Sequence, residues 1–305
     1  MRRTDPAAAS SRQSSLFLSF QELWNYRQLI RQLAARDLKA RYKVSVLGFF
    51  WSLLRPLLTI GVLALVFSFL LNFESTRYQV TYTTLLLVTY LPWFFFSSAL
   101  LEATSSLLTN ANLVKKVYCP RAVFPVAVVV SNLVNFLFSL AVLIPVVYVG
   151  TGASPTWTLM QLPFLLLTHT ALLLGLALLV SATNVLYRDT TQIMEFGVFI
   201  WFYLSPVLYD VYDIFPMLSK YTTLGPYLYL LNPMAGLLEW YRYIVLSSQL
   251  VSASVLEPGI QAQVQALNQT MFQMGIPYAA GVSYLILAAG YSVFKRLEVR
   301  AVDEL

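Results

Sequence analysis

Long apolar runs alternate with short polar segments along most of the chain. A bilayer core about 30 Å thick needs roughly 20 consecutive apolar residues in a helix. Six runs meet or approach this length, and the fifth is the shortest: Leu47–Leu71, Tyr82–Leu101, Ala122–Val149, Leu159–Thr183, Ile193–Leu208 and Ile276–Phe294. The pattern therefore predicts an all-α integral membrane protein with six transmembrane helices.

The segment before the first run has a different pattern. Leu23, Tyr26, Ile30 and Leu33 recur at three- and four-residue spacing across residues 20–43, with basic and polar residues between them. This spacing predicts an amphipathic helix that lies in the headgroup plane and turns its basic face to anionic lipid. An ordinary juxtamembrane helix that only orients the chain is the alternative. We expect residues 1–43 to form a cytoplasmic tail and interface helix, and residues 44–305 the transmembrane domain.

A further apolar stretch precedes the last predicted span. Tyr221–Leu246 is interrupted by Pro226, Asn232 and Pro233. Irregular backbone at membrane depth must be buried within protein, because lipid offers no hydrogen-bond partners. The stretch therefore predicts two half-helices that form a re-entrant outer hairpin.

Composition and charge support this interpretation. Only 11% of the 305 residues are charged and 58% are hydrophobic, whereas soluble domains are about 25% charged. A nucleic-acid-binding protein would need a basic face on a soluble body. Sixteen of the 20 Lys and Arg residues fall in segments on one side of the predicted membrane. By the positive-inside rule, that side is the cytoplasm and contains both termini.

Candidate chemistry within the chain is sparse. The chain lacks the Gly-Lys pair of a phosphate-binding loop, so we expect ATP hydrolysis on another chain. One cysteine, Cys119, and one histidine, His169, leave no thiol or histidine metal cluster. His169 lies within a predicted span without an acidic partner in its own helix. We therefore favour a neutral, hydrogen-bonded structural role for it over a catalytic one.

Four segments resemble the membrane subunits of ABC-2 type polysaccharide exporters, in the order expected for that family. They read RDLKARYKVSVLGFFWSLLRPLL, LLTNANLVKKVYCPRAVFPVAVVVSNLVNF, NVLYRD and LLNPMAGLLEWYR. In the first segment the matching residues are Leu47, Gly48, Trp51, Pro56, Leu57 and Leu58. The resemblance covers nearly the whole chain.

The resemblance implies a permease subunit of an ATP-driven exporter of lipid-linked polysaccharide in the bacterial inner membrane. It implies a homodimer that works with two ABC ATPase subunits, which hold ATP and Mg, and it leaves O-antigen, capsule and teichoic acid open as substrates. An ABC-2 permease for a drug or simple lipid, a membrane enzyme acting on a lipid-linked sugar, and a channel remain alternatives. No cofactor and no nucleic acid is expected on this chain.

The resemblance also places candidate residues. A coupling helix for the ATPase maps to residues 105–117, and a second cytoplasmic loop follows the fourth span. Together they supply the expected ATPase contacts, which are Asn110, Asn112, Lys115, Lys116, Tyr187, Arg188 and Asp189. For the lysines, the positive-inside rule is an equally good explanation.

The anionic lipid head of such a substrate would need cations near the inner leaflet. Candidates for this role are Arg36, Lys39, Arg41, Lys43 and Arg55. Arg55 lies deeper, and it either accompanies the phosphate or extends its side chain back to the interface. Aromatic rings pack against the C–H faces of sugars. The expected glycan path and outer gate include Tyr203, Tyr209, Tyr229 and Trp240, although an aromatic belt is the better explanation for most of the outer tyrosines and tryptophans.

Overall fold

We describe the protein from a computed structural model, which covers residues 23–42, 50–70, 80–116, 119–211, 229, 231–249 and 274–304. Within these ranges every regular element is a helix. In chain order they are α2 (Arg27–Tyr42), α3 (Phe50–Ala64), η2 (Leu65–Leu70), α4 (Tyr82–Thr109), α5 (Ala111–Lys116), α6 (Val123–Thr151), η3 (Trp157–Gln161), α7 (Leu162–Leu186), α8 (Thr190–Leu204), α11 (Pro233–Leu246), η4 (Ser247–Gln249) and α13 (Ile276–Glu304).

Five helical segments are long and apolar enough to cross a membrane. They are Phe50–Ser68, Tyr82–Thr109, Val123–Thr151, Trp157–Leu186 and Ile276–Glu298. They correspond to the first four predicted spans and the last one. The fifth predicted run overlaps α8 (Thr190–Leu204), a helix of 15 residues, which is shorter than the others. The described residues therefore confirm the all-helical class and five of the six runs as candidate spans.

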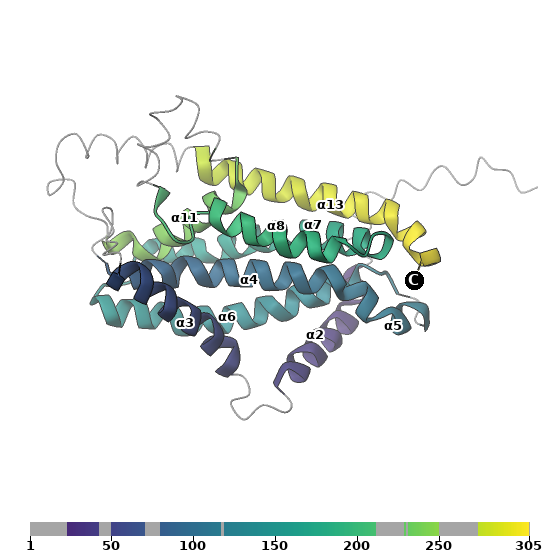
Figure 1. Ribbon diagram of the computed structural model, residues 1–305, viewed down its shortest axis with the longest axis horizontal. Coiled ribbons are helices and arrows are strands. Elements are labelled where there is room, and N and C mark those ends of the chain that lie inside the picture. The colour runs from purple at the N-terminus through teal and green to yellow at the C-terminus, as the bar shows by residue number, and fades with distance from the viewer. Residues whose placement is uncertain are drawn as a thin grey trace, which may run out of the picture.

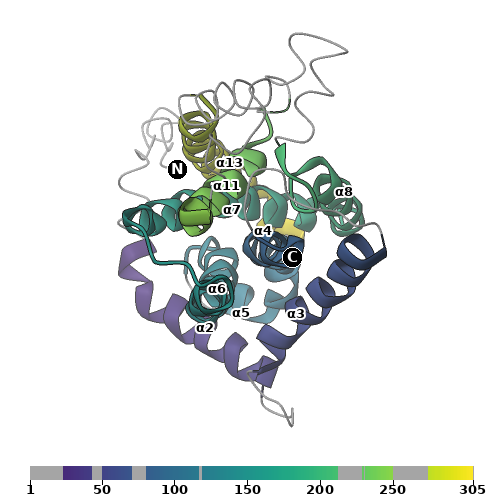
Figure 2. The ribbon, with the colours of Figure 1, turned by 90° about the vertical axis from the view of Figure 1, so that its left-hand side faces the viewer.

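The long helices form a bundle with two distinct ends (Figure 1). α5 and the C-terminal end of α13 lie at one end, and α11 lies at the other. In the most apolar parts of α4, α6 and α7, 61%, 56% and 61% of the residues are buried, against 11% in the first candidate span. α4, α6 and α7 therefore form the centre of the bundle, while α3 lies at its periphery (Figure 2).

α7 and α13 approach each other most closely at two glycines. A Cβ atom added to Gly290 would lie 2.0 Å from the carbonyl oxygen of Gly175. Small residues allow helix backbones to approach this closely, which matters inside a membrane because lipid tails provide no hydrophobic drive for association. The contact joins the last span to the centre of the bundle.

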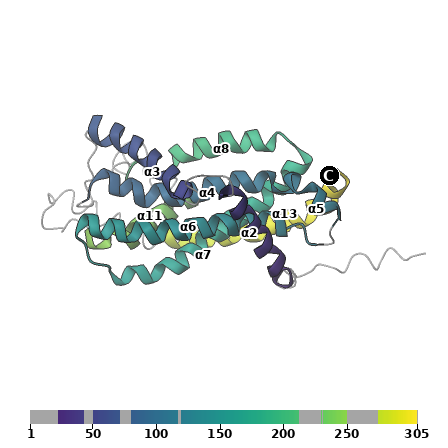
Figure 3. The ribbon, with the colours of Figure 1, turned by 90° about the horizontal axis from the view of Figure 1, so that it is seen from below.

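The predicted amphipathic helix is present as α2, which begins at Arg27. Leu33 and Ala34 are buried, and Leu23 and Ile30 are partly buried against a cluster of residues from the bundle. α2 crosses α6 (Figure 3). The apolar face recognised in the sequence thus packs on the protein itself.

Two proline-containing segments interrupt the helices near α11. α8 ends at Leu204, so the fifth predicted run is helical for only part of its length; Ser205 is extended with ψ 147°. Pro206 explains this ending, because a residue before proline is disfavoured in the α region. α11 begins at Pro233, where the side chain of Asn232 accepts a hydrogen bond from the backbone N–H of Met234. α11 thus covers the second part of the stretch Tyr221–Leu246, most of the first part lies outside the described residues, and the re-entrant hairpin stays a prediction.

Candidate functional site

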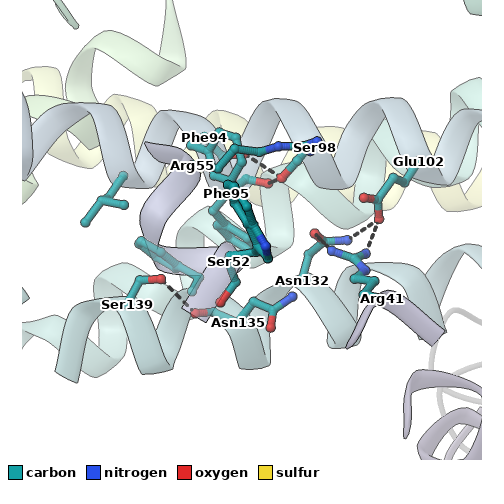
Figure 4. Close-up of a pocket in the computed structure, with 13 residues that line it drawn as sticks. Arg41, Ser52, Arg55, Phe94, Phe95, Ser98, Glu102, Asn132, Asn135 and Ser139 are labelled. Atoms are coloured by element: carbon teal, nitrogen blue, oxygen red, sulfur yellow. Dashed lines mark hydrogen bonds and ion pairs between the residues drawn. The ribbon is translucent and has the colours of Figure 1, made fainter. Parts of the chain in front are cut away.

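A cavity of about 550 Å³ lies between α2, α3, α4 and α6. We refer to it as the pocket (Figure 4). Its charged side chains are Arg41 from α2, Arg55 from α3 and Glu102 from α4. Segments separated by more than 40 residues in the sequence therefore meet around one space.

One side of the pocket holds a compact polar triad. Arg41 forms an ion pair with Glu102 and donates a hydrogen bond to Oδ1 of Asn132 at 3.2 Å. Nδ2 of Asn132 donates to the same carboxylate at 2.7 Å, and also to the carbonyl of Val128 at 3.0 Å. Glu102 thus accepts from two donors, and Asn132 holds the pair in place from the neighbouring helix.

The second cation of the pocket is Arg55. Its guanidinium forms no ion pair or hydrogen bond with any residue that the structure describes. Two cations and one carboxylate leave the pocket with a net positive charge. An anionic group is therefore the ligand that its electrostatics favour.

Aromatic rings form much of the remaining wall. Phe95 and Phe136 stack with ring centroids 4.7 Å apart and an angle of 4° between their planes. Trp51 also lines the pocket and is 44% exposed. The pocket thus combines a cationic side with an apolar, aromatic side. This combination suits an amphipathic anion rather than a free inorganic ion.

The lone histidine lies behind this wall and is absent from the lining of the pocket. His169 is fully buried, with its ring centroid 5.2 Å from Phe95 and its Nδ1 atom 3.3 Å from the hydroxyl of Tyr241. These contacts agree with the structural role that the sequence favoured.

Arg36 and Lys39, two further predicted phosphate-binding cations, do not line the pocket. Arg36 forms an ion pair with Asp37 at 2.9 Å and donates to Oδ1 of Asn110 at 2.9 Å. Lys39 is exposed on α2. Lys43 lies outside the described residues. Of the five predicted cations, the structure brings Arg41 and Arg55 together.

The range predicted for the coupling helix, residues 105–117, contains the C-terminal end of α4 and the short helix that directly follows it, α5. None of its residues is buried, and Asn112, Lys115 and Lys116 are exposed. Asn110 has a different position from the one expected for an ATPase contact, because its side chain bridges the C-terminal end of α4 and Arg36 of α2.

The second predicted contact segment is also accessible. Tyr187, Arg188 and Asp189 connect α7 to α8 and are all exposed. Chain direction places this connection at the same end of the bundle as α5 (Figure 1). The structure therefore leaves both segments free of burial within the chain.

Three of the four predicted outer aromatic residues form one cluster. The Tyr229 hydroxyl donates to the Tyr209 hydroxyl at 3.0 Å, which in turn donates to the carbonyl of Tyr203 at 3.0 Å. We call these residues the tyrosine cluster. Trp240 lies apart from it: the indole is buried, packs on Phe164, and donates to the side-chain oxygen of Gln161 at 2.9 Å.

The partners of Arg41 in the pocket were not predicted from the sequence. Neither Glu102 nor Asn132 was among the candidate residues, and neither was Asn135, which also lines the pocket. A signal was present: two asparagines spaced by three residues within a strongly apolar run lie on one face of a helix. Such a pair indicates a polar neighbour at that depth, although it does not identify the neighbour.

The amino-acid sequence of this chain is similar to those of known membrane transport proteins. The profile of the family described as ABC-2 type transporter matches residues 28–248. The chain is 33% identical to the O-antigen export system permease protein RfbA of Myxococcus xanthus over 235 residues, which are 77% of this chain and 86% of the relative. Two proteins of the same name from Klebsiella pneumoniae are 30% identical over 73% of the chain and 82% of the relative, and 26% identical over 90% and 94%.

Proposed function

The chain belongs to the ABC-2 type transporter family, and on this basis we propose that it is the permease subunit of an ATP-driven exporter of lipid-linked polysaccharide in the bacterial inner membrane. The observation that carries this proposal is the similarity over most of the chain to permeases of O-antigen export systems. The pocket supports it, because its cationic and aromatic sides match a lipid phosphate joined to a glycan.

The proposed topology has six spans, with both termini in the cytoplasm. α8 would be the fifth span, although its 15 residues extend only about 22 Å at 1.5 Å per residue. Residues 205–210 continue it with irregular but buried backbone, which a membrane tolerates when protein surrounds it. α2 would lie at the cytoplasmic interface, and α11 would be the second half of the outer hairpin.

The proposed ligand of the pocket is the phosphate group of the lipid carrier. Arg55 would bind it first, because its guanidinium has no partner among the described residues. Arg41 would contribute once the phosphate competes with Glu102, since both anions would bind the same guanidinium. The aromatic wall would pack against the first sugar or the adjoining lipid chain.

The proposed energy source is a separate ABC ATPase, present in two copies with ATP and Mg. α5 and the connection at Tyr187–Asp189 would be its docking surface. Both are exposed at one end of the bundle, and α5 contributes no buried residue to the chain's own core. Their side chains are therefore available to a partner.

A second copy of the chain would complete the assembly. α3 and α8 lie along one edge of the molecule (Figure 3) and expose large apolar side chains, among them Phe50, Val62, Phe196 and Phe199. Glu195 is exposed on the same helix as Phe196. Because a carboxylate facing lipid is costly, a protein partner explains this edge better than lipid alone.

Gene deletion in the native host tests the proposed function. We expect the surface polysaccharide to disappear and its lipid-linked form to accumulate inside the cell, as measured by immunoblotting of intact and lysed cells. Restoring the wild-type chain should restore export. Normal surface polysaccharide after deletion, or loss without intracellular lipid-linked glycan, would exclude this function and favour a permease for another substrate.

A point variant then tests the pocket. Arg55→Gln should lower export about tenfold or more, because a hydrogen bond to a charged group is worth about 1.5–3 kcal/mol. Arg296→Gln is the matched control, since it removes the same charge from an exposed position on α13. Both variants must reach wild-type amounts in the membrane and co-purify with the ATPase. Equal export by the two would contradict the role of Arg55.

A further inference from the structure

The segment that follows α8 is not helical, and most of its residues are buried. Ser205, Pro206, Val207 and Asp210 are all buried. We call residues 205–210 the unwound segment. Backbone carbonyls in such a segment cannot be left without hydrogen-bond donors, because an unpaired buried polar group is costly. Their partners therefore show what holds the segment in place.

Side chains from α4 satisfy two of these carbonyls. The hydroxyl of Thr89 donates to the carbonyl of Val207 at 2.9 Å, and the hydroxyl of Tyr82 donates to the carbonyl of Leu208. α4 is central to the bundle, so these bonds attach one side of the unwound segment to its buried core.

Arg242 of α11 satisfies two more. Its Nη2 atom donates to the carbonyls of Pro206 and Tyr209, both at 2.7 Å. The side chain of Arg242 is only 1% exposed. A single buried guanidinium thus spans the unwound segment and connects it to a different helix.

Two carboxylates compensate the buried charge. Arg242 forms an ion pair with Glu239, one turn earlier in α11, and its Nη1 atom lies 3.9 Å from Oδ1 of Asp210. The side chains of Glu239 and Asp210 are 3% and 2% exposed. Buried charges of this kind are retained only when they are paired and hydrogen-bonded. We call Arg242, Glu239 and Asp210 the latch.

The tyrosine cluster is hydrogen-bonded to the latch through Tyr209. The backbone carbonyl of Tyr209 accepts from Arg242, while its hydroxyl donates to the carbonyl of Tyr203 and accepts from Tyr229. The position of Arg242 therefore determines where Tyr209 lies. If the bonds to Arg242 broke, Tyr209 and its two partners would lose their common support.

We propose that Arg242 is the positioning residue of the latch, and that it holds the unwound segment and the tyrosine cluster closed at the α11 end of the bundle. The assignment of this end as the outer mouth of a glycan path rests on the proposed function; the latch itself does not. Glycan passage would require the segment to separate from Arg242, and ATP-driven movement of α11 relative to α4 would achieve this.

Accessibility of a buried reporter tests the proposal. Cys119 is the single cysteine, so Cys119→Ser provides a cysteine-free background. Val207→Cys places a thiol in the unwound segment at a position that is 1% exposed. The full chain in nanodiscs is treated with a polar maleimide, and labelling is followed by mass spectrometry. Neither glycan nor export activity is needed, so the result is independent of the proposed function.

The variant that opens the latch must not leave buried charges uncompensated. Arg242→Gln is therefore combined with Glu239→Gln and Asp210→Asn, which removes all three charges. We expect the reporter to be labelled about tenfold faster or more, because one lost charge-assisted hydrogen bond shifts a local equilibrium by at least that factor. Arg242→Lys should give an intermediate rate, since an ammonium cannot reproduce the planar guanidinium contacts.

Two controls separate a local latch from general loosening. Arg296→Gln should leave the labelling rate of the Val207→Cys reporter unchanged. A second reporter, Ala99→Cys, lies in the centre of α4 with 0% exposure and should remain unlabelled in the latch variant. The proposal is overturned if the Val207→Cys reporter reacts no faster in the latch variant than in the Arg296→Gln control. It is equally overturned if both buried reporters become reactive together.

Discussion

Replacement of Gly290 by alanine tests the helix crossing that joins the last span to the bundle. The added Cβ would lie 2.0 Å from the carbonyl oxygen of Gly175, where ordinary contact begins at 3.4 Å. Because the obstacle is backbone, no side chain can rotate away. α7 and α13 must therefore separate by about 1 Å or more, and a gap of that size removes a quarter to a half of the dispersion energy of the atoms involved.

The expected change in the free energy of unfolding of Gly290→Ala is the difference between two effects. Overpacking costs about 1–3 kcal/mol, whereas replacing a helical glycine by alanine gains roughly 0.5–1 kcal/mol. We expect a net destabilisation of about 1–2 kcal/mol, which corresponds to a midpoint lower by roughly 2–6 °C for a chain of this size. The midpoint is measured in detergent by fluorescence-detected size exclusion after heating.

The same helix offers a matched control. A Cβ atom at Gly281 would meet nothing within 4 Å, so Gly281→Ala gains helix propensity without a clash. Its midpoint should stay the same or rise. If Gly290→Ala and Gly281→Ala had equal midpoints, the close approach of α7 and α13 would not be the contact that stabilises this part of the bundle.

Three further predictions follow from single side chains. Asn232→Ala should lower the thermal midpoint, because it removes the cap of α11, worth about 1 kcal/mol, together with hydrogen bonds to Trp201, Leu204 and Ser205. Asn232→Asp keeps the accepting oxygen but loses the two hydrogen bonds that the amide nitrogen donates, so it should restore only part of the midpoint; a midpoint no higher than that of Asn232→Ala would disprove the capping role. Glu102→Gln should release Arg41 and increase the affinity of the pocket for a short polyprenyl phosphate about tenfold. The affinity is measured by the shift of the thermal midpoint that the ligand causes. Unchanged or weaker binding would contradict a competition between Glu102 and the phosphate for Arg41. Burial raises the pKa of the Cys119 thiol. At pH 7 the rate of maleimide labelling should therefore be lower than for an exposed thiol. As the pH is raised, this rate should continue to increase beyond the ordinary thiol pKa. A rate that levels off at or below that pKa would show that the thiol is not shielded.

Local sequence pattern was sufficient for the class of fold and for most element positions. The apolar runs from Tyr82 to Leu101 and from Ile276 to Phe294 predicted helices that the structure contains, because a helix in lipid needs only continuous apolar length. The resemblance mapped a coupling helix to residues 105–117; α5 covers Ala111–Lys116 of this range, whereas residues 105–109 belong to α4. Pro233 and Asn232 marked the start of α11, since both act through their own backbone and immediate neighbours.

The candidate site was only partly predictable. Arg41 and Arg55 were recognised as cations near one membrane face, but Glu102 and Asn132 were not recognised as the partners of Arg41. These four side chains come from four helices, and their meeting depends on how each helix is rotated and tilted. Trp240 illustrates the same limit: it was grouped with the outer tyrosines by sequence position, yet it faces η3 and α7.

The sequence alone determined that this protein is a helical membrane protein and where most of its described helices lie. The side of the membrane that carries its positive charge stays a prediction. These properties depend on the free energy of each segment in lipid compared with water, and each segment can be judged separately. Only the tertiary structure decided that Gly175 meets Gly290, that Arg242 holds the unwound segment, and that α2 packs on the bundle. Those contacts join residues that are distant in the chain, and their energies depend on distances of a few tenths of an ångström that no one-dimensional pattern contains.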